Sequence, residues 1–73
     1  MNTIHFTLRE GDEFIPLIQL LKAASLVETG AEAQQAVVDG RVTLNGAKEL
    51  RKRAKCRPGD RIGFAGNEIV VEG

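Results

Sequence analysis

Apolar and polar positions follow two different periods along this chain, and the changes of period divide it into strands and helices. Near the N-terminus the apolar residues alternate with polar ones: Ile4, Phe6 and Leu8. Such alternation predicts a short half-buried strand over residues 3–8. His5 lies on its polar side, so we interpret it as a surface residue of an edge strand. The segment 10–13, Glu-Gly-Asp-Glu, predicts a turn after this strand.

A first helix is predicted after this turn. Its apolar residues recur at helical spacing: Leu17, Ile18, Leu20, Leu21 and Ala24. Pro16 suits the first helical position, where the amide that proline lacks would have no partner within the helix. We expect the helix to fray near Ser25.

A second helix is predicted to begin at Thr29. Thr29 and Glu32 have the spacing of a capping box, in which the threonine hydroxyl accepts from the amide near Glu32 and the glutamate reaches back. A narrow stripe of small apolar residues allows close packing on the first helix: Ala33, Ala36 and Val37. Gly40 is expected to end the helix in the left-handed conformation that glycine adopts at little cost.

Beyond residue 40 the period changes to that of a strand, with Val42 and Leu44 on one face. Residues 45–46, Asn-Gly, are the strongest hairpin signal in the chain and predict a type I′ turn. The returning arm, 47–50, alternates poorly, so we expect it to be short, bulged or half loop. The segment 51–55 carries too many charges for a buried strand.

The C-terminal residues predict a second hairpin, after a turn at 58–60. A two-residue tip at 66–67 places Phe64 opposite Ile69 on one face. Together these elements predict an α+β domain, in which two packed helices lie against a small, mostly antiparallel sheet with β-hairpins. The 73 residues leave room for one domain, 1–73, with a small core.

Little in the composition suits catalysis or metal binding. Cys56 is the only cysteine, which excludes an internal disulfide and favours a reducing, cytoplasmic setting. Lys55 and Arg57 flank it and are expected to lower its thiol pKa, although packing as a small hydrophobe is the commoner role. We find no metal-ligand set, no nucleophile with a base and no phosphate-cradling glycine loop, so we expect neither enzyme activity nor a cofactor. No stretch reaches the ~18 apolar residues of a membrane span.

The basic residues are concentrated in the second half of a chain that is neutral overall. Up to Gly40 two basic residues face six acidic ones, and beyond it eight face four. The eight are Arg41, Lys48, Arg51, Lys52, Arg53, Lys55, Arg57 and Arg61. A concentrated positive surface suits a polyanion, of which nucleic acid is the commonest. The alternative is a solvated charged loop without a partner.

The type of nucleic acid follows from where the basic and aromatic residues lie. The second helix carries Glu32 and Asp39 but no lysine or arginine, which argues against a helix-turn-helix DNA reader. The chain has no Trp or Tyr, and we interpret its three phenylalanines as core residues: Phe6, Phe14 and Phe64. Stacking platforms for single strands are then missing. Structured RNA, recognised by shape and phosphate geometry, fits better.

Several short strings in the span 14–64 occur together in a known family. They are Leu17-x-x-Leu20-Leu21, Thr29-x-x-x-Ala33, Val37-x-x-Gly40-Arg41-Val42-x-Leu44-Asn45-Gly46 and Pro58-Gly59-Asp60-x-Ile62. In order and spacing they resemble the S-four RNA-binding domain, or αL motif, of ribosomal protein S-four, RNA pseudouridine synthases and tyrosyl-tRNA synthetases. Without a catalytic domain, the chain is similar to the small stand-alone bacterial members.

The resemblance implies RNA binding through the second helix and the adjoining hairpin. Carried onto this chain, it implies these contact residues: Arg41, Asn45, Lys48, Arg51, Lys52, Arg53 and Lys55. Asn45 has an equally good alternative role as a turn former. Many family members have Ser/Thr-Arg where this chain has Thr29-Gly30. The segment 51–55 is therefore expected to supply the charge that the helix lacks.

We therefore predict a monomeric, non-catalytic module that binds structured ribosomal or transfer RNA by a basic ridge beside the second helix, in association with the ribosome and translation. It is expected to bind no membrane and no small-molecule substrate. The alternative is an adaptor that docks the same ridge on an acidic protein partner, either on the ribosome or on an RNA-processing enzyme. Salt-sensitive binding to purified RNA distinguishes the two.

Overall fold

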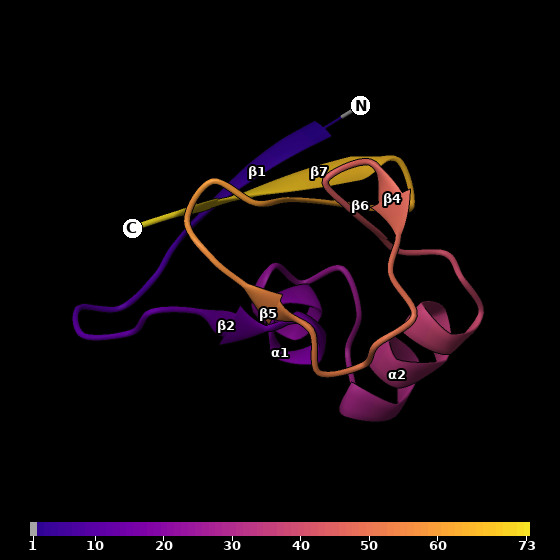
Figure 1. The fold of residues 1–73 in the computed structure, drawn as a ribbon. Coiled ribbons are helices and arrows are strands. Elements are labelled where there is room, and N and C mark those ends of the chain that lie inside the picture. Colours follow the sequence, from indigo (N-terminus) through magenta and orange to yellow (C-terminus); the bar gives the residue numbers. More distant parts are fainter. Residues whose placement is uncertain (1) are drawn as a thin grey trace.

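In the computed structural model, which describes residues 2–73, the chain forms two layers (Figure 1). One layer is a five-stranded sheet made of β1 (Asn2–Thr7), β3 (Thr43–Leu44), β4 (Ala47–Lys48), β6 (Arg61–Phe64) and β7 (Asn67–Glu72). The other holds two helices and a two-stranded sheet: α1 (Leu17–Ala23), α2 (Gly30–Val38), β2 (Ile15–Pro16) and β5 (Lys55–Cys56). The large sheet has the order β1-β7-β6-β3-β4, and only its β1–β7 pair is parallel. The predicted α+β architecture is confirmed.

The predicted N-terminal strand forms β1, at the edge of the large sheet. Its parallel pairing with β7 sets Ile4 beside Ile69, so both ends of the chain lie in neighbouring strands. Leu8 is buried and extends the pairing, because its N–H donates to the carbonyl oxygen of Glu72 at 2.8 Å. His5 is exposed, with Nδ1 3.0 Å from Oε2 of Glu72. The surface position of His5 is confirmed.

The first helix, α1, begins one residue later than predicted. Pro16 is outside the helix, with an extended ψ of 142°, and pairs with Lys55 in the small sheet. Proline is tolerated there because β2 is a short edge strand that needs few donors. The Leu17 N–H donates to the carbonyl of Ala54 at 2.8 Å, which ties the start of α1 to β5. The helix ends where predicted, and Ser25 takes a left-handed φ of 61° just beyond it.

The second helix, α2, has the predicted cap with one difference. The Thr29 Oγ1 accepts from the Glu32 N–H at 3.1 Å, as expected. The Glu32 carboxylate, however, accepts from the N–H of Glu28 rather than of Thr29, at 3.0 Å. The apolar stripe is completely buried: Ala33, Ala36 and Val37. Gly40 ends the helix with the predicted left-handed φ, 74°.

The first hairpin joins β3 and β4 by the predicted turn. Asn45 and Gly46 have φ angles of 53° and 87°, and two consecutive left-handed residues define a type I′ turn. Leu44 lies opposite Ala47, and each strand has only two residues. The expected short returning arm is confirmed.

The second hairpin joins β6 and β7 in a register that differs from the prediction. Its turn lies one residue earlier, at 65–66, where both φ angles are left-handed. Ile69 therefore lies opposite Ile62 instead of Phe64. Because the register differs by two residues, which is one full period of a strand, the same side chains still face the core.

Hydrogen bonds at the turn 58–60 continue this register. The N–H of Val71 donates to the carbonyl of Asp60 at 3.0 Å, and the N–H of Gly59 donates to the carbonyl of Val71 at 2.8 Å. These bonds set Val71 beside Asp60, which a tip at 66–67 would not allow. The contacts at the far end of the hairpin thus agree with a tip at 65–66.

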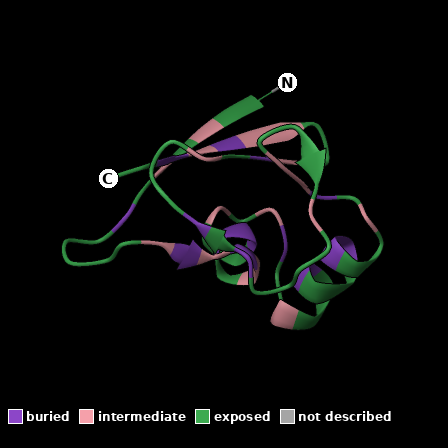
Figure 2. Ribbon diagram, viewed as in Figure 1, coloured by how far each residue is buried: buried purple, intermediate pink, exposed green. Residues whose placement is uncertain are grey.

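The core lies between the two layers, where the helices and the central strands carry the buried positions (Figure 2). Its largest fully buried aliphatic residues are Leu17, Leu20, Leu21, Val37, Val42, Ile62, Ile69 and Val71. Phe6, Phe14 and Phe64, which we interpreted as core, are only half-buried. Aliphatic side chains fill the narrow interior and leave the larger rings at its margin. Within residues 2–73, no helix combines the length and apolar character that crossing a bilayer requires.

Candidate nucleic-acid interface

The chain from β4 to β5 runs beside α2 and carries most of the predicted contact residues (Figure 1). At the C-terminal end of α2, the Lys48 side chain passes close to Gly40: its Cδ lies 3.0 Å from the point that a Cβ on Gly40 would occupy. At the N-terminal end of α2, Lys52 and Arg53 line a groove together with Gly30. The basic residues therefore form two groups, one toward each end of this helix. All seven predicted contact residues are exposed.

The group at the C-terminal end of α2 consists of Arg41 and Lys48. The Arg41 Nη2 lies 3.7 Å from Oδ2 of Asp39, and its guanidinium carbon lies 5.8 Å from the ring centroid of Phe64. These contacts are at the surface, so each is weak and leaves the guanidinium available to a phosphate. Lys48 has no ion-pair partner in the described chain.

Arg51 differs from the other predicted residues because Glu49 holds it. Its Nε and Nη2 donate to the two carboxylate oxygens of Glu49 at 3.0 and 3.1 Å, and its backbone N–H donates to the same group at 3.0 Å. These hydrogen bonds lower the pKa of Glu49 and raise that of Arg51. The charge of Arg51 is thus largely offset, which makes it the least available of the six basic residues among the seven.

The group at the N-terminal end of α2 borders an open groove of about 620 Å³. Four basic side chains line it: Lys22, Lys52, Arg53 and Lys55. Its described lining includes no acidic residue. The Lys55 Nζ lies 4.9 Å from the ring centroid of Phe14, within the range of a cation–π interaction. The groove is thus strongly positive, and an aromatic ring forms part of its wall.

The small sheet holds this groove in shape. Lys55 pairs with Pro16, and its two neighbours, Ala54 and Cys56, are buried. These two anchors fix the loop that carries Lys52 and Arg53 beside the start of α1. Our expectation that the segment 51–55 would form no buried strand holds for its loop, whereas Lys55 belongs to β5 with an exposed side chain.

Sequence reasoning missed Lys22 and did not include Gln34 among the predicted contact residues. Lys22 lies in the last turn of α1, 30 positions before Lys52, so nothing local connects the two. Lys22 lies four residues after Ile18, and residues four apart share a helix face. This spacing was a usable signal, because Ile18 also lines the groove. Gln34 lines the groove as well, whereas the neighbouring Gln35 amide donates to Oδ1 of Asp39 at 2.8 Å.

Asn45 is occupied by contacts within the protein. Its Nδ2 donates to Oδ1 of Asp60 at 3.1 Å, and its Oδ1 accepts from the N–H of Arg61 at 2.9 Å. Asp60 also accepts from the N–H of Arg57 at 2.8 Å. Asn45 therefore braces the first hairpin against the turn at 58–60. Of its two predicted roles, this favours turn formation over contact with RNA.

Replacing Asn45 with alanine should destabilise the protein by about 2 kcal/mol. About half arises because alanine lacks the short polar side chain that lets asparagine adopt the left-handed region, and about half from the lost side-chain hydrogen bonds. Asn45→Gly removes only the second contribution and should cost about 1 kcal/mol. Urea unfolding of the three proteins measures both differences, and equal stability of all three would contradict the bracing role.

Cys56 is not the reactive thiol that its basic neighbours suggested. Its side chain is fully buried, and burial raises the pKa of the thiol from 9.0 to about 12, with smaller contributions from Asp60 and Glu49. Lys55 and Arg57 flank it in sequence, but both are exposed, because successive side chains of a strand point to opposite faces. The predicted lowering of the pKa is wrong, and packing is the role of this residue.

The protein should lose stability as the pH rises from about 9 toward 12. Above pH 9 the thiol loses its proton in the unfolded protein but retains it in the folded one. The contribution of Cys56 to the free energy of unfolding is therefore fully present below pH 9 and is lost as the pH approaches the folded pKa. Urea unfolding across this range measures the effect. Cys56→Ala should show a shallower decline, and parallel curves for the two proteins would contradict the assignment.

In the folded protein at neutral pH, iodoacetamide should alkylate Cys56 far more slowly than in urea.

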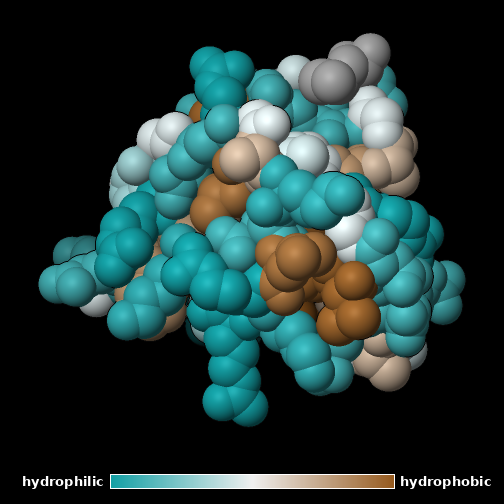
Figure 3. Space-filling model, turned by 45° about the vertical axis from the view of Figure 1, so that its right-hand side comes forward, coloured by the Kyte–Doolittle hydropathy of each residue, from teal (hydrophilic) through white to brown (hydrophobic). Residues whose placement is uncertain are grey.

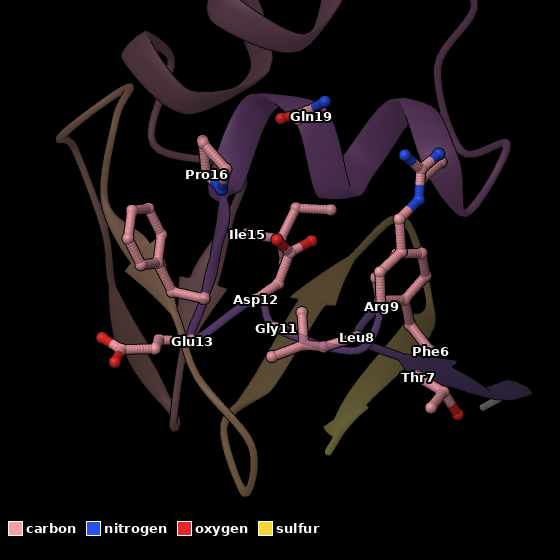
Figure 4. Close-up of a pocket in the computed structure, with 12 residues that line it drawn as sticks. Phe6, Thr7, Leu8, Arg9, Gly11, Asp12, Glu13, Ile15, Pro16 and Gln19 are labelled. Carbon is pink, nitrogen blue, oxygen red and sulfur yellow. The ribbon is translucent and has the colours of Figure 1, made fainter.

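A second hollow, of about 710 Å³, lies beside the loop between β1 and β2 (Figure 4). Side chains of this loop surround it on one side and Gln19 of α1 on the other (Figure 4). Its charges are mixed, with Arg9 set against Asp12 and Glu13. This balance makes it a poor site for a polyanion.

The surface also carries a small apolar cluster within a mainly hydrophilic face (Figure 3). The large hydrophobic side chains that are most exposed are Val38, at 53%, and Leu50, at 57%. Leu50 directly precedes the basic loop, so an exposed apolar side chain adjoins the candidate interface.

Comparisons with known proteins show the family to which this chain belongs. Residues 6–72 match the family model described as the S4 domain. The chain is 40% identical over 57 residues, 78% of its length and 81% of the relative's, to the "Putative RNA-binding protein YbcJ" of Escherichia coli (strain K12). It has the same identity and coverage with the uncharacterized YbcJ of Shigella flexneri. The solution structure of YbcJ from E. coli, described as having an αL motif involved in RNA binding, matches with a TM-score of 0.73 at 36% identity, over 100% of this chain and 91% of that one. A family match over nearly the whole chain, with a related structure of the same fold, shows that this chain is a member of the S4 domain family.

Proposed function

We propose that this protein is a non-catalytic module that binds structured RNA through the basic residues beside α2. The observation that carries the proposal is the groove at the N-terminal end of this helix. Basic side chains from α1, from the 51–53 loop and from β5 converge there. Among the residues that the structure describes, no acidic side chain lines the groove. A polyanion is the ligand that such a surface attracts.

The proposal assigns phosphate contacts to two groups of residues. Arg41 and Lys48 serve one end of α2, and Lys52, Arg53 and Lys55 serve the other. A nine-residue helix is about 13.5 Å long, so the two groups are spaced for phosphates that are not adjacent. Such spacing suits a folded RNA better than a short single strand. The RNA binding ascribed to the relative from E. coli supports the same reading.

Further parts of the proposal concern setting and partners. Ribosomal and transfer RNA are the structured RNAs we propose as targets, which would link the protein to the ribosome and translation. We also propose a monomer in the cytoplasm, where the unpaired and buried Cys56 would remain reduced. No catalytic step is assigned to any residue of the chain.

A second candidate is docking on an acidic protein, and the exposed Leu50 favours it. A leucine 57% exposed beside basic residues is the kind of mixed surface that protein interfaces use. Leu50→Ser should then weaken binding to such a protein and leave binding to purified RNA unchanged. If Leu50→Ser instead weakens binding to purified RNA as much as binding to the protein, docking on a protein is contradicted.

Salt dependence of binding to purified structured RNA tests the main proposal. Five phosphate contacts release counterions, so log affinity should fall against log salt concentration with a slope of roughly −3.5 to −4.5. Titration of a transfer RNA or a ribosomal RNA fragment at several salt concentrations gives this slope. A slope near zero, or no binding, would overturn the electrostatic interface.

A further inference from the structure

The basic groove also has an apolar wall, which bare phosphate binding does not need. Phe14, Pro16 and Ile18 line it together with the four basic side chains. The amides of Gln19 and Gln34 are the remaining polar groups of its lining. Its volume of about 620 Å³ lies within the range of small-molecule sites, roughly 300–1,000 Å³. A lone phosphate would leave the apolar wall and both amides unused.

We propose that this groove is a subsite for one unpaired nucleotide of the bound RNA. Its phosphate lies against Lys22, Lys52 and Arg53. Its base lies on the apolar wall, stacked on the ring of Phe14, with Gln19 and Gln34 available to the base edge. This inference rests on the proposed RNA binding and adds what the RNA must contain, an unpaired nucleotide beside a helix.

Each part of the nucleotide has a matching surface in the groove. A base within an A-form helix is stacked between its neighbours and cannot reach an aromatic ring, whereas bulges and loops can present an unpaired base. Amide side chains both donate and accept hydrogen bonds, as the edges of bases require. The charge, shape and hydrogen-bonding capacity of the groove therefore all match an unpaired nucleotide.

Lys55 covers the ring of Phe14 in the free protein, with its Nζ 4.9 Å from the ring centroid. A cation over an aromatic ring at the protein surface is held weakly, and stacking of a base on such a ring is stronger. Lysine is also long and flexible, so its ammonium can leave the ring when the base arrives. Once displaced, Lys55 makes the phosphate contact that the proposed function assigns to it.

The test compares an RNA hairpin that has a single unpaired nucleotide in its stem with the same hairpin fully paired. We expect the protein to bind the bulged RNA roughly fivefold or more tightly, as a base–aromatic stack provides. A fluorescent adenine analogue at the bulge should change its emission on binding. Phe14→Leu should bind both RNAs equally and leave the fluorescence unchanged.

Phe6→Leu is the matched control, because Phe6 is also half-buried but lies outside the groove. It should retain the preference and the fluorescence change, and thermal melting confirms that both variants are folded. Equal, salt-dependent binding of both RNAs by the wild type would overturn the nucleotide subsite and leave the proposed function intact. Failure to bind either RNA would overturn both. An undiminished preference in folded Phe14→Leu would also overturn the subsite.

Discussion

Replacing Lys48, Lys52 and Arg53 together with alanine should weaken binding to structured RNA roughly 100-fold, at about 1 kcal/mol for each lost phosphate contact. The three side chains come from both basic groups, and none has an ion-pair partner in the described chain. The slope of log affinity against log salt should become shallower by about two to three units, because each contact contributes about one. Arg51 is left unchanged because Glu49 already holds it.

The control removes three arginines outside the proposed contact residues, Arg9, Arg57 and Arg61, of which Arg61 pairs with Glu68 at 3.1 Å. At physiological ionic strength, charges farther than about 8 Å from the RNA are screened, so this variant should bind within about threefold of the wild type. Both variants should unfold within about 1 kcal/mol of the wild type, since all six side chains are exposed. If the two triple variants lose affinity equally, net charge rather than the proposed interface governs binding. If neither does, the basic segment is a solvated loop.

Gly40→Val should destabilise the protein by about 2 kcal/mol, which corresponds to a fall in melting temperature of roughly 8–16 °C for a domain of this size. Gly40 has a φ of 74°, and a β-branched residue is strongly disfavoured there. The nearest atom to an added Cβ is the flexible Lys48 Cδ, at 3.0 Å, so the backbone conformation rather than a clash sets the cost. This turn directs the chain from α2 into the hairpin that follows Arg41.

Gly30→Ala is the control for this prediction. Gly30 begins α2 without a left-handed φ, and a Cβ there would meet no atom within 4 Å. Alanine also favours helices more than glycine does, so this variant should be as stable as the wild type or up to about 1 kcal/mol more stable. Differential scanning calorimetry of the three proteins measures the contrast. An unchanged melting temperature for Gly40→Val would show that the helix terminus tolerates another conformation.

The sequence alone was sufficient for several features that depend on residues within about four positions. The cap at Thr29, the helix end at Gly40 and the type I′ turn at 45–46 all appear where predicted. Each is a local bond or a local backbone angle, so the residue types involved determine it. The period of the apolar residues likewise predicted which faces of the helices are buried, since burial follows from the geometry of the element itself.

Tertiary contacts decided the features that join distant segments. Pairing of β2 with β5 took Pro16 out of the helix and buried Cys56, which reversed the predicted direction of its pKa shift. Bonds between Val71 and the 58–60 turn form only in the register that the second hairpin adopts, which differs from the predicted one. Local propensity cannot choose between registers two residues apart, because both keep the same faces buried.

The candidate interface divides in the same way. The positions of the basic residues along the chain were enough to locate its charge, because these residues are concentrated between Arg41 and Arg61. Only the folded chain brought Lys22 and Phe14 to the loop at 51–53, across 29 or more positions of sequence. Only the folded chain set Arg51 against Glu49 and Asn45 against Asp60. Residue types determine which charges and rings a chain possesses, whereas packing of the core determines which of them share a surface and which remain free to bind.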